Sequence, residues 1–351
     1  MTMRAQIVIA VHDPARPLQR AIDSVLDGVG GEMGVVVVCH GIGRASFGEI
    51  NDPRVRWVEF QDGIRSPAGP FNAGIAAATA PYVGVMGSDD FFDPGGTHAL
   101  LARLDSTPDV LIYPMRHQTG ASLPNPLSRR GRRRRLDPVR DRLSYRTAPL
   151  ALVRTELIRT LGLHMSPGLR TGEDVEFSAR LWFSDHRIDF YPDDPAYVIG
   201  ADGPARVTHA AMPITDELAA FERLFSQPWV RALARSRRAS LVTKTVRVHL
   251  LGSVWRHVAQ GTMTDEVRAH VSHVIRQGVE VSPSALAPLA RHDRAVIDAL
   301  WGPGTTMDVI AAVSERGATS RWERYLTRNP LLSLHREGDL RRALRYRTWP
   351  T

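Results

Sequence analysis

The sequence predicts a doubly wound, largely parallel α/β sheet followed by an α-helical region. In the first part of the chain, short continuous apolar runs, typical of buried parallel strands, alternate with helical patterns. Strand, helix and strand repeated with short connections are typical of open α/β folds. Beyond residue 210 the apolar runs give way to amphipathic helical segments. We therefore expect two domains, residues 1–210 and 211–351.

The elements follow from these patterns in chain order. Strands are expected at residues 6–11, 35–39, 55–60 and 82–86. Helices of the first domain are expected at residues 18–26, 70–78, 97–104 and 175–182. Helical segments of the second domain are expected at residues 229–257, 264–276, 283–301, 307–315 and 320–326.

Two adjacent carboxylates, Asp89 and Asp90, end the fourth expected strand. Ligands of open α/β sheets bind at the carboxyl ends of strands. Two carboxylates this close repel each other and raise each other's pKa unless a cation lies between them. A hard divalent ion such as Mg²⁺ or Mn²⁺ removes that repulsion and keeps coordination positions open for phosphate. The alternative is a surface turn without a ligand, because Asp is a common turn former.

The order and spacing of several motifs resemble the nucleotide-sugar-dependent inverting glycosyltransferases of family-2 type, which have the GT-A fold. The resemblance lies between residues 5 and 200. It is carried by IVIAVHD (7–13), GPFNAG (69–74), APYVGVMGSDD (80–90), APLALVR (148–154), LG (161–162) and GEDVEFSARLW (172–182). The resemblance implies metal-dependent transfer of a sugar, with inversion, from a nucleoside diphosphate sugar to an acceptor hydroxyl.

The resemblance also implies a metal site for Mn²⁺ or Mg²⁺. Asp89 matches the metal-binding Asp of the family's Asp-x-Asp motif, and Asp90 stands beside it. Gly87 stands where the family commonly has another Asp, which removes one carboxylate. His209 follows the last expected strands, where related enzymes often supply a metal-binding His; a plain surface histidine is the alternative.

Glu173 and Asp174 resemble the pair in which the Asp is the catalytic base. A carboxylate in the first turn of a helix is held ionised by the helix dipole and free N–H groups. Simple helix capping is the alternative for both residues. By the same resemblance, seven residues are expected to line the nucleotide-sugar pocket: Val11, His12, Asp13, His40, Asn72, Ser88 and Asp89.

The end of the second strand departs from the family. It holds Cys39 and His40 where the family usually has Asp residues that read uracil and ribose. His40 can stack on a base or form a hydrogen bond with it, but it lacks the acceptor pair of a carboxylate. A UDP-sugar is the donor that the resemblance favours, with the base left open. With Gly87, this departure makes a non-catalytic scaffold that binds a nucleotide or a partner the leading alternative.

The chain is strongly basic, with a formal net charge of +8 and a dense run of arginines at residues 129–135. Such runs are usually solvated and mobile. The alternative is that they attract an anionic acceptor, a lipid-linked glycan or a membrane surface. Nucleic acid is disfavoured because the run lacks interleaved aromatic residues. A basic membrane- or nucleic-acid-binding protein is therefore the third reading of the function.

The remaining composition agrees with a globular enzyme. Hydrophobic residues make up 43% of the chain. No apolar run reaches the length of about 18 residues that a membrane span needs, and no signal peptide is apparent. The single cysteine, Cys39, excludes an internal disulfide. A cytoplasmic location is expected, with peripheral contact at the inner membrane face left open. Acceptor binding, homo-oligomerisation and membrane contact all stay open for the C-terminal region.

Overall fold

In the computed structural model, residues 2–121, 123, 125–202, 212–318, 320 and 322–347 are described. They divide into two compact units. The first runs to Asp137 and continues from Arg146, and the second consists of Pro138–Tyr145 and the chain from Met212 onward. A contiguous division near residue 210 does not anticipate that the segment Pro138–Tyr145 packs with the helical unit.

The first unit is built on a seven-stranded sheet with the strand order β3-β2-β1-β4-β8-β6-β9. The strands are β1 (Ala5–Val11), β2 (Met33–His40), β3 (Val55–Phe60), β4 (Tyr82–Gly87), β6 (Val110–Ile112), β8 (Ala151–Arg154) and β9 (Ile188–Phe190). Strands β1 to β4 pair in parallel, as do β6 and β9. Strand β8 is antiparallel to both of its neighbours. The mostly parallel sheet and all four expected strands are thus confirmed.

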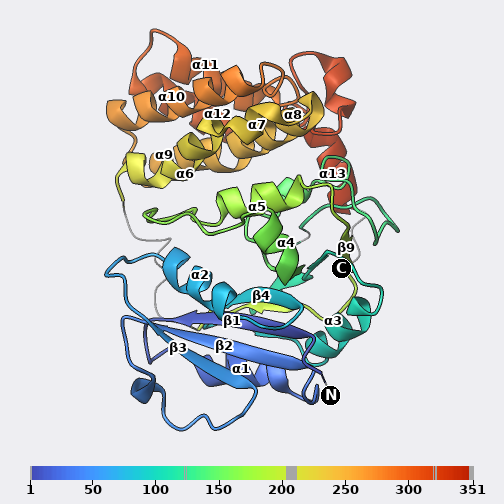
Figure 1. Ribbon diagram of the computed structural model, residues 1–351. Helices are drawn as coiled ribbons and strands as arrows, with labels where there is room; N and C mark the ends of the chain where they lie inside the picture. The colour runs from blue at the N-terminus through green and yellow to red at the C-terminus, as the bar shows by residue number, and fades with distance from the viewer. Residues whose placement is uncertain are drawn as a thin grey trace. The chain divides into compact units, whose positions relative to one another are not determined.

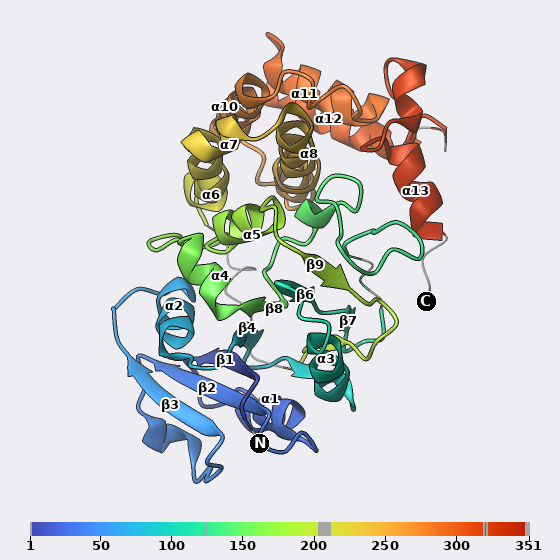
Figure 2. The ribbon, with the colours of Figure 1, turned by 45° about the vertical axis from the view of Figure 1, so that its right-hand side comes forward.

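Helices cover both faces of this sheet (Figures 1 and 2). The helices of the first unit are α1 (Leu18–Leu26), α2 (Ala68–Ala77), α3 (Gly96–Leu104), α4 (Thr155–Thr160) and α5 (Val175–Trp182), with a 3₁₀ turn at Arg44–Phe47. A second, small sheet has the order β5-β10-β7 and consists of β5 (Phe91–Phe92), β10 (Tyr197–Ile199) and β7 (Met115–His117).

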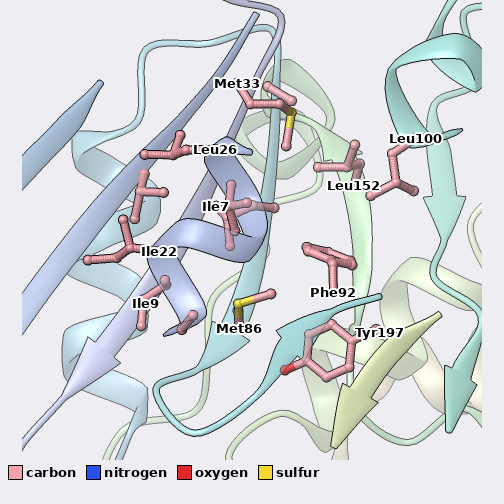
Figure 3. Close-up of a cluster of buried hydrophobic side chains, with 14 of the residues drawn as sticks. Ile7, Ile9, Ile22, Leu26, Met33, Met86, Phe92, Leu100, Leu152 and Tyr197 are labelled. Carbon is pink, nitrogen blue, oxygen red and sulfur yellow. The ribbon is translucent and has the colours of Figure 1, made fainter. Parts of the chain in front are cut away.

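Alternate residues of β1 explain why its apolar run is continuous. Ile7 and Ile9 point to one face, where they join a core with Ile22 and Leu26 of α1 (Figure 3). Val8 points to the other face, toward α2. At Gly74 of α2 an added Cβ would lie 2.2 Å from a methyl carbon of Val8, so only glycine allows this close packing. Because both faces are buried, both sets of alternating positions must be apolar.

The second unit is helical, as expected from the sequence (Figure 1). Its helices are α6 (Ile214–Ser226), α7 (Pro228–Ala232), α8 (Arg235–Lys244), α9 (Leu251–Ala259), α10 (Asp265–Val281), α11 (Arg291–Trp301), α12 (Thr306–Ala318) and α13 (Asp339–Arg347). A π-helical turn, Thr245–Leu250, joins α8 to α9, and 3₁₀ turns cover Leu143–Tyr145 and Pro330–Leu334. Among the described residues, none of these helices combines the length and the apolar character that crossing a membrane requires.

Three predicted segments of this unit differ from the structure. The single helix expected at 229–257 is wrong, because the backbone is extended at Leu233 and Ala234, between α7 and α8. No glycine or proline marks that break. The segment expected at 283–301 becomes helical only at Arg291, and Pro288 explains the delay because it cannot donate a helical hydrogen bond.

The third difference concerns residues 320–326. Ser320 and Glu323 make both hydrogen bonds of a capping box: Ser320 N donates to Glu323 Oε2 at 2.9 Å and Glu323 N donates to Ser320 Oγ at 3.3 Å. The described residues that follow nevertheless form only turns. The capping box is therefore present, but within the described residues of this segment no helix follows it. A capping box fixes only the first turn and does not by itself extend a helix.

Buried polar contacts explain why Pro138–Tyr145 belongs to the second unit. Tyr145 OH donates to Glu337 Oε2 at 3.0 Å and accepts from Arg247 Nη1 at 2.6 Å. Ser240 Oγ donates to the other oxygen of Glu337 at 2.9 Å. All of these side chains are buried, so removing one partner would leave another polar group unpaired. This network holds the segment to the helices.

Candidate active site

The carboxyl ends of β1 to β4 meet at one edge of the large sheet. In the parallel register Ala10 lies opposite Gly87, and His40 lies opposite Phe60. The residues that follow these strands therefore leave the sheet side by side. The electrostatic surroundings of His12 confirm the convergence, since the charges of Arg16, Asp13, His40 and Asp89 all act on its ring. This is the edge at which open α/β sheets bind their ligands.

Asp89 is held by two arginines at this edge. Its Oδ1 lies 3.0 Å from Nη1 of Arg16, and only 7% of the Asp89 side chain and 9% of the Arg16 side chain are exposed. Arg20 Nη2 donates to the main-chain oxygen of Asp89 at 2.6 Å. Arg20 also donates from Nη1 and Nη2 to the two carboxylate oxygens of Asp202, at 2.5 and 2.9 Å. This pairing lowers the pKa of Asp202 to about 2. Sequence reasoning missed both arginines, whose only signal is their i, i+4 spacing after the first strand.

Asp90 has a different environment from Asp89. Its Oδ2 accepts from Tyr197 OH at 2.5 Å, and its Oδ1 accepts from Gly200 N at 2.8 Å. Tyr197 OH also accepts from Gly87 N at 3.1 Å. Burial, reinforced by the charge of Asp90, raises the pKa of Tyr197 well above its usual value. Asp90 therefore ties the turn after β4 to β10.

The same arrangement explains Gly87. A Cβ added at Gly87 would lie 2.6 Å from Oδ2 of Asp90. A side chain at this position would displace the Asp90 carboxylate from Tyr197. The lack of a side chain at Gly87, where the family usually has Asp, therefore leaves room for the Asp90 carboxylate to bind Tyr197.

The described residues fit a divalent cation through one carboxylate, Asp89. Cations of this kind are often held by one or two carboxylates together with substrate phosphates. No group of three or more His, Cys, Asp or Glu side chains able to hold a metal occurs among the described residues. Both oxygens of Asp90 bind Tyr197 and Gly200, and the predicted ligand His209 lies outside the described residues. The role of Asp90 and His209 as metal ligands remains a prediction.

Beside His40, this edge contains a residue that sequence reasoning missed, Asp62. His40 Nε2 lies 2.9 Å from Asp62 Oδ1, and the His40 ring packs on Phe60 with the centroids 5.8 Å apart. The contact with His40 lowers the pKa of Asp62. Burial, with the charge of Arg16, lowers the pKa of His12 and favours its neutral form. Asp62 follows the end of β3 and supplies beside His40 the carboxylate that the end of β2 lacks.

The other expected pocket residues have mainly structural contacts. The Val11 side chain is fully buried in the core, and Ser88 is buried. Asp13 Oδ1 accepts from Ala15 N at 2.9 Å and shapes the turn after β1. Both amide atoms of Asn72 bind the main chain of Met165, at 2.9 and 2.8 Å. Contact of Asn72 with a base or ribose therefore remains a prediction, while the structure gives this residue a positioning task.

That task concerns the segment carrying Glu173 and Asp174. Asn72 holds Met165, and the next residue, Ser166, donates its N–H to the main-chain oxygen of Glu173 at 2.7 Å. A helix that follows a parallel strand begins at the carboxyl end of that strand, so the start of α2 lies at the ligand edge. Through Asn72 the segment before Asp174 is anchored to that helix.

Asp174 directly precedes α5 and makes no side-chain capping hydrogen bond to it. Simple capping therefore does not account for this residue. Its main-chain oxygen accepts from Ser178 N at 2.9 Å and begins the helix. Burial raises the pKa of Glu173.

The arginine run at residues 129–135 is anchored to β9. Phe190 N donates to Arg133 O at 2.8 Å, and Arg135 N donates to Asp189 Oδ1 at 2.9 Å. Arg134 Nε donates to Tyr191 OH at 2.9 Å. The main chain of the run therefore lies alongside β9, a strand of the large sheet. The expectation of a mobile loop did not anticipate this. The arginine side chains from 132 to 135 remain exposed.

The strand order of the mostly parallel sheet, with charged residues gathered at the carboxyl ends of its first four strands, agrees with the GT-A fold. Residues 6–162 match the model of Glycosyl transferase family 2.

Solved structures of S. aureus TarS have the same fold. TarS 1–349 in complex with UDP-GlcNAc gives a TM-score of 0.69 at 16% identity, with 91% of this chain and 93% of that chain covered. TarS 1–349 in complex with UDP gives 0.69 at 14% identity over the same shares.

One curated relative is the succinoglycan biosynthesis protein ExoO of Rhizobium meliloti (strain 1021). It is 37% identical over 102 residues, which are 28% of this chain. The matched stretch spans 29% of that relative's length.

Proposed function

We propose that the protein is an inverting glycosyltransferase that moves a sugar from a UDP-sugar to an acceptor hydroxyl. The observation that carries the proposal is the convergence of His12, Arg16, His40 and Asp89 at the carboxyl edge of the parallel strands. This edge offers aromatic rings for a base, cations for a diphosphate and a carboxylate for a divalent ion. The neighbouring TarS structures were solved with UDP-GlcNAc and UDP, which supports a uridine nucleotide.

The uracil base would lie against His12 and the His40–Asp62 pair. A carboxylate oxygen of Asp62 can accept from the imide N–H of uracil, and a histidine N–H can donate to a neighbouring carbonyl of the base. Asp62 would in this way take over the acceptor role that the end of β2 does not offer. The diphosphate would extend along the edge toward Arg16 and Asp89.

Asp174 would be the general base that takes the proton of the acceptor hydroxyl. An effective base must be ionised before the reaction, and the N-terminal position on α5 favours the ionised form of Asp174. The half-buried Glu173, with its raised pKa, is the weaker candidate and would hold the segment in place. The hydroxyl, once deprotonated, would attack the anomeric carbon from the face opposite the leaving diphosphate, which inverts the configuration.

Mn²⁺ or Mg²⁺ bound through Asp89 would offset the charge of the leaving diphosphate. The acceptor would be a saccharide or a lipid-linked glycan, which agrees with the name of the relative ExoO. The exposed arginines of residues 129–135 favour an acceptor that carries negative charge.

The direct test is the release of UDP from a panel of UDP-sugars in the presence of saccharide acceptors, with the anomeric configuration of the product read by NMR. Asp174→Asn should lower turnover by about 10²-fold or more, the usual scale for loss of a general base, and leave donor affinity within a few-fold. Glu176→Gln, on the same helix, is the matched control and should retain turnover. Near-normal turnover of Asp174→Asn would exclude that residue as the base.

A non-catalytic scaffold remains the second candidate, because Gly87 and the Cys39–His40 strand end depart from the family's usual carboxylates. The same panel separates the two functions. Binding of a UDP-sugar without turnover in any acceptor mixture would favour the scaffold, whereas formation of an inverted product establishes the enzyme.

A further inference from the structure

Among the described residues, Asp89 is the carboxylate that fits a cation, and its Oδ1 forms an ion pair with Arg16. Arg16 Nη1 lies 3.0 Å from Asp89 Oδ1, and less than a tenth of either side chain is exposed. Arg16 also has a buried Nε atom without a hydrogen-bond partner among the described residues. A guanidinium has five N–H donors, so this arrangement leaves donor capacity unused at the ligand edge.

A buried ion pair of this kind resists the loss of one partner. Leaving a buried carboxylate or a buried guanidinium without a counter-charge costs far more free energy than giving each of them a new partner of opposite charge. A divalent cation that binds Asp89 by itself competes with Arg16 for the carboxylate, and displacing Arg16 would take this anion away from the guanidinium. A nucleoside diphosphate supplies another anion, because a guanidinium matches phosphate oxygens with two parallel hydrogen bonds.

We propose that Arg16 is an exchangeable counter-ion of the donor site: it neutralises Asp89 in the ligand-free protein and transfers to the donor's diphosphate when a divalent cation binds Asp89. This inference rests on the proposed function, since it assigns Arg16 as a diphosphate-binding residue of the same site. No covalent bond changes in the exchange. Its consequence is that cation and nucleotide bind cooperatively, each raising the affinity of the other by the same factor.

The backbone around Arg16 allows such an exchange without refolding. Arg16 N donates to Asp13 O at 3.2 Å, and Leu18 N donates to Arg16 O at 2.7 Å, so the main chain is fixed at the start of α1. Only the long side chain has to move between two anions at one edge. The neighbouring Arg20 cannot replace it, because Arg20 pairs with Asp202 and contacts only the main-chain oxygen of Asp89.

The test measures Mn²⁺ binding by electron paramagnetic resonance, with and without UDP, in the full-length protein. In the parent, Mn²⁺ alone should bind weakly and UDP should tighten it by about 5- to 150-fold, the usual range of coupling between two sites. Arg16→Gln should tighten the binding of Mn²⁺ alone, weaken UDP binding and lower the coupling, leaving only the part that comes from direct contact between Mn²⁺ and the diphosphate. Arg16→Lys keeps the charge and should keep Mn²⁺ alone weakly bound.

Arg20→Gln is the matched control, because it removes the same charge close to Asp89 without baring the carboxylate; the coupling should persist in this variant. If Arg16→Gln fails to fold by circular dichroism, Arg16→Met keeps the apolar part of the side chain and serves the same comparison. Unchanged Mn²⁺ affinity, or unchanged coupling, in a folded neutral variant of Arg16 would overturn the inference. A parent protein that binds neither UDP nor UDP-sugars would instead refute the proposed function.

Discussion

Two buried tyrosines of the first unit, Tyr113 and Tyr197, make a sharp test of how the turn after β4 is held. The rings of Tyr197 and Tyr113 stack in one core with the centroids 5.8 Å apart (Tyr197 is labelled in Figure 3). Tyr197 OH donates to the Asp90 carboxylate at 2.5 Å and accepts from Gly87 N at 3.1 Å. Tyr113 OH, equally buried, has no hydrogen-bond partner among the described residues.

Replacing each tyrosine by phenylalanine should therefore have opposite effects. A hydrogen bond to a charged group contributes about 1.5–3 kcal/mol, and the lost acceptor for Gly87 N adds about 1 kcal/mol, so Tyr197→Phe should destabilise the first unit by about 2.5–4 kcal/mol. An unsatisfied buried hydroxyl costs about 1–3 kcal/mol, which a small cavity partly offsets, so Tyr113→Phe should be neutral or slightly stabilising.

The assay is urea unfolding of both variants together with hydrogen exchange of the peptide that covers residues 82–92. Because a chain with two units need not unfold in one step, the local exchange readout identifies which unit is affected. Tyr197→Phe should speed exchange at Gly87 and Asp90, and Tyr113→Phe should not. A cost for Tyr197→Phe below about 0.5 kcal/mol, or a larger cost for Tyr113→Phe, would refute the reasoning, because the hydrogen bond to a charged group would then contribute nothing.

Three further predictions concern the donor and acceptor sites. Gly87→Asp, which restores the family's usual residue, should not strengthen Mn²⁺ binding and should lower the melting temperature, because its Cβ would lie 2.6 Å from Asp90 Oδ2 and overpacking costs about 1–3 kcal/mol. Asp62→Asn should weaken UDP binding in calorimetry by about 10-fold or more, through loss of a hydrogen bond to a charged group, with little change for CDP; equal UDP binding would remove Asp62 from the base site. Replacing Arg130 and Arg132 by Gln should raise the acceptor KM at low salt without changing donor binding, and the difference should shrink at physiological salt, where the screening length is about 8 Å; unchanged kinetics at low salt would leave the run a solvated surface.

The sheet could be predicted because its sequence pattern has few alternatives. A run such as residues 7–11 is apolar at every position, as a strand covered on both faces requires. Its polar end then places His12 and Asp13 at the ligand edge by topology alone. The same reasoning located Asp89, and applied to the end of β3 it would have found Asp62, which follows that strand as Asp89 follows β4.

The remaining features depend on contacts between distant segments. Tyr197 and Asp90 are 107 positions apart in the sequence, and three strands and the helices α1 and α2 lie between Arg16 and Asp89, so no local pattern indicates either pair. The extended residues Leu233 and Ala234 lack any glycine or proline signal. Ser320 and Glu323 show the converse, a complete local signal that the chain around it does not extend into a helix.

Calorimetry of donor binding tests the central claim most directly, since the account requires a nucleoside diphosphate sugar at the carboxyl edge of β1 to β4. UDP-, GDP- and CDP-sugars would be titrated into the parent and into Asp89→Asn, each with and without Mn²⁺. The account predicts that a UDP-sugar binds the parent, that Mn²⁺ tightens this binding, and that Asp89→Asn abolishes the effect of Mn²⁺. Absence of binding by every nucleotide sugar, or an Asp89→Asn variant that binds donor and Mn²⁺ as well as the parent, would contradict it.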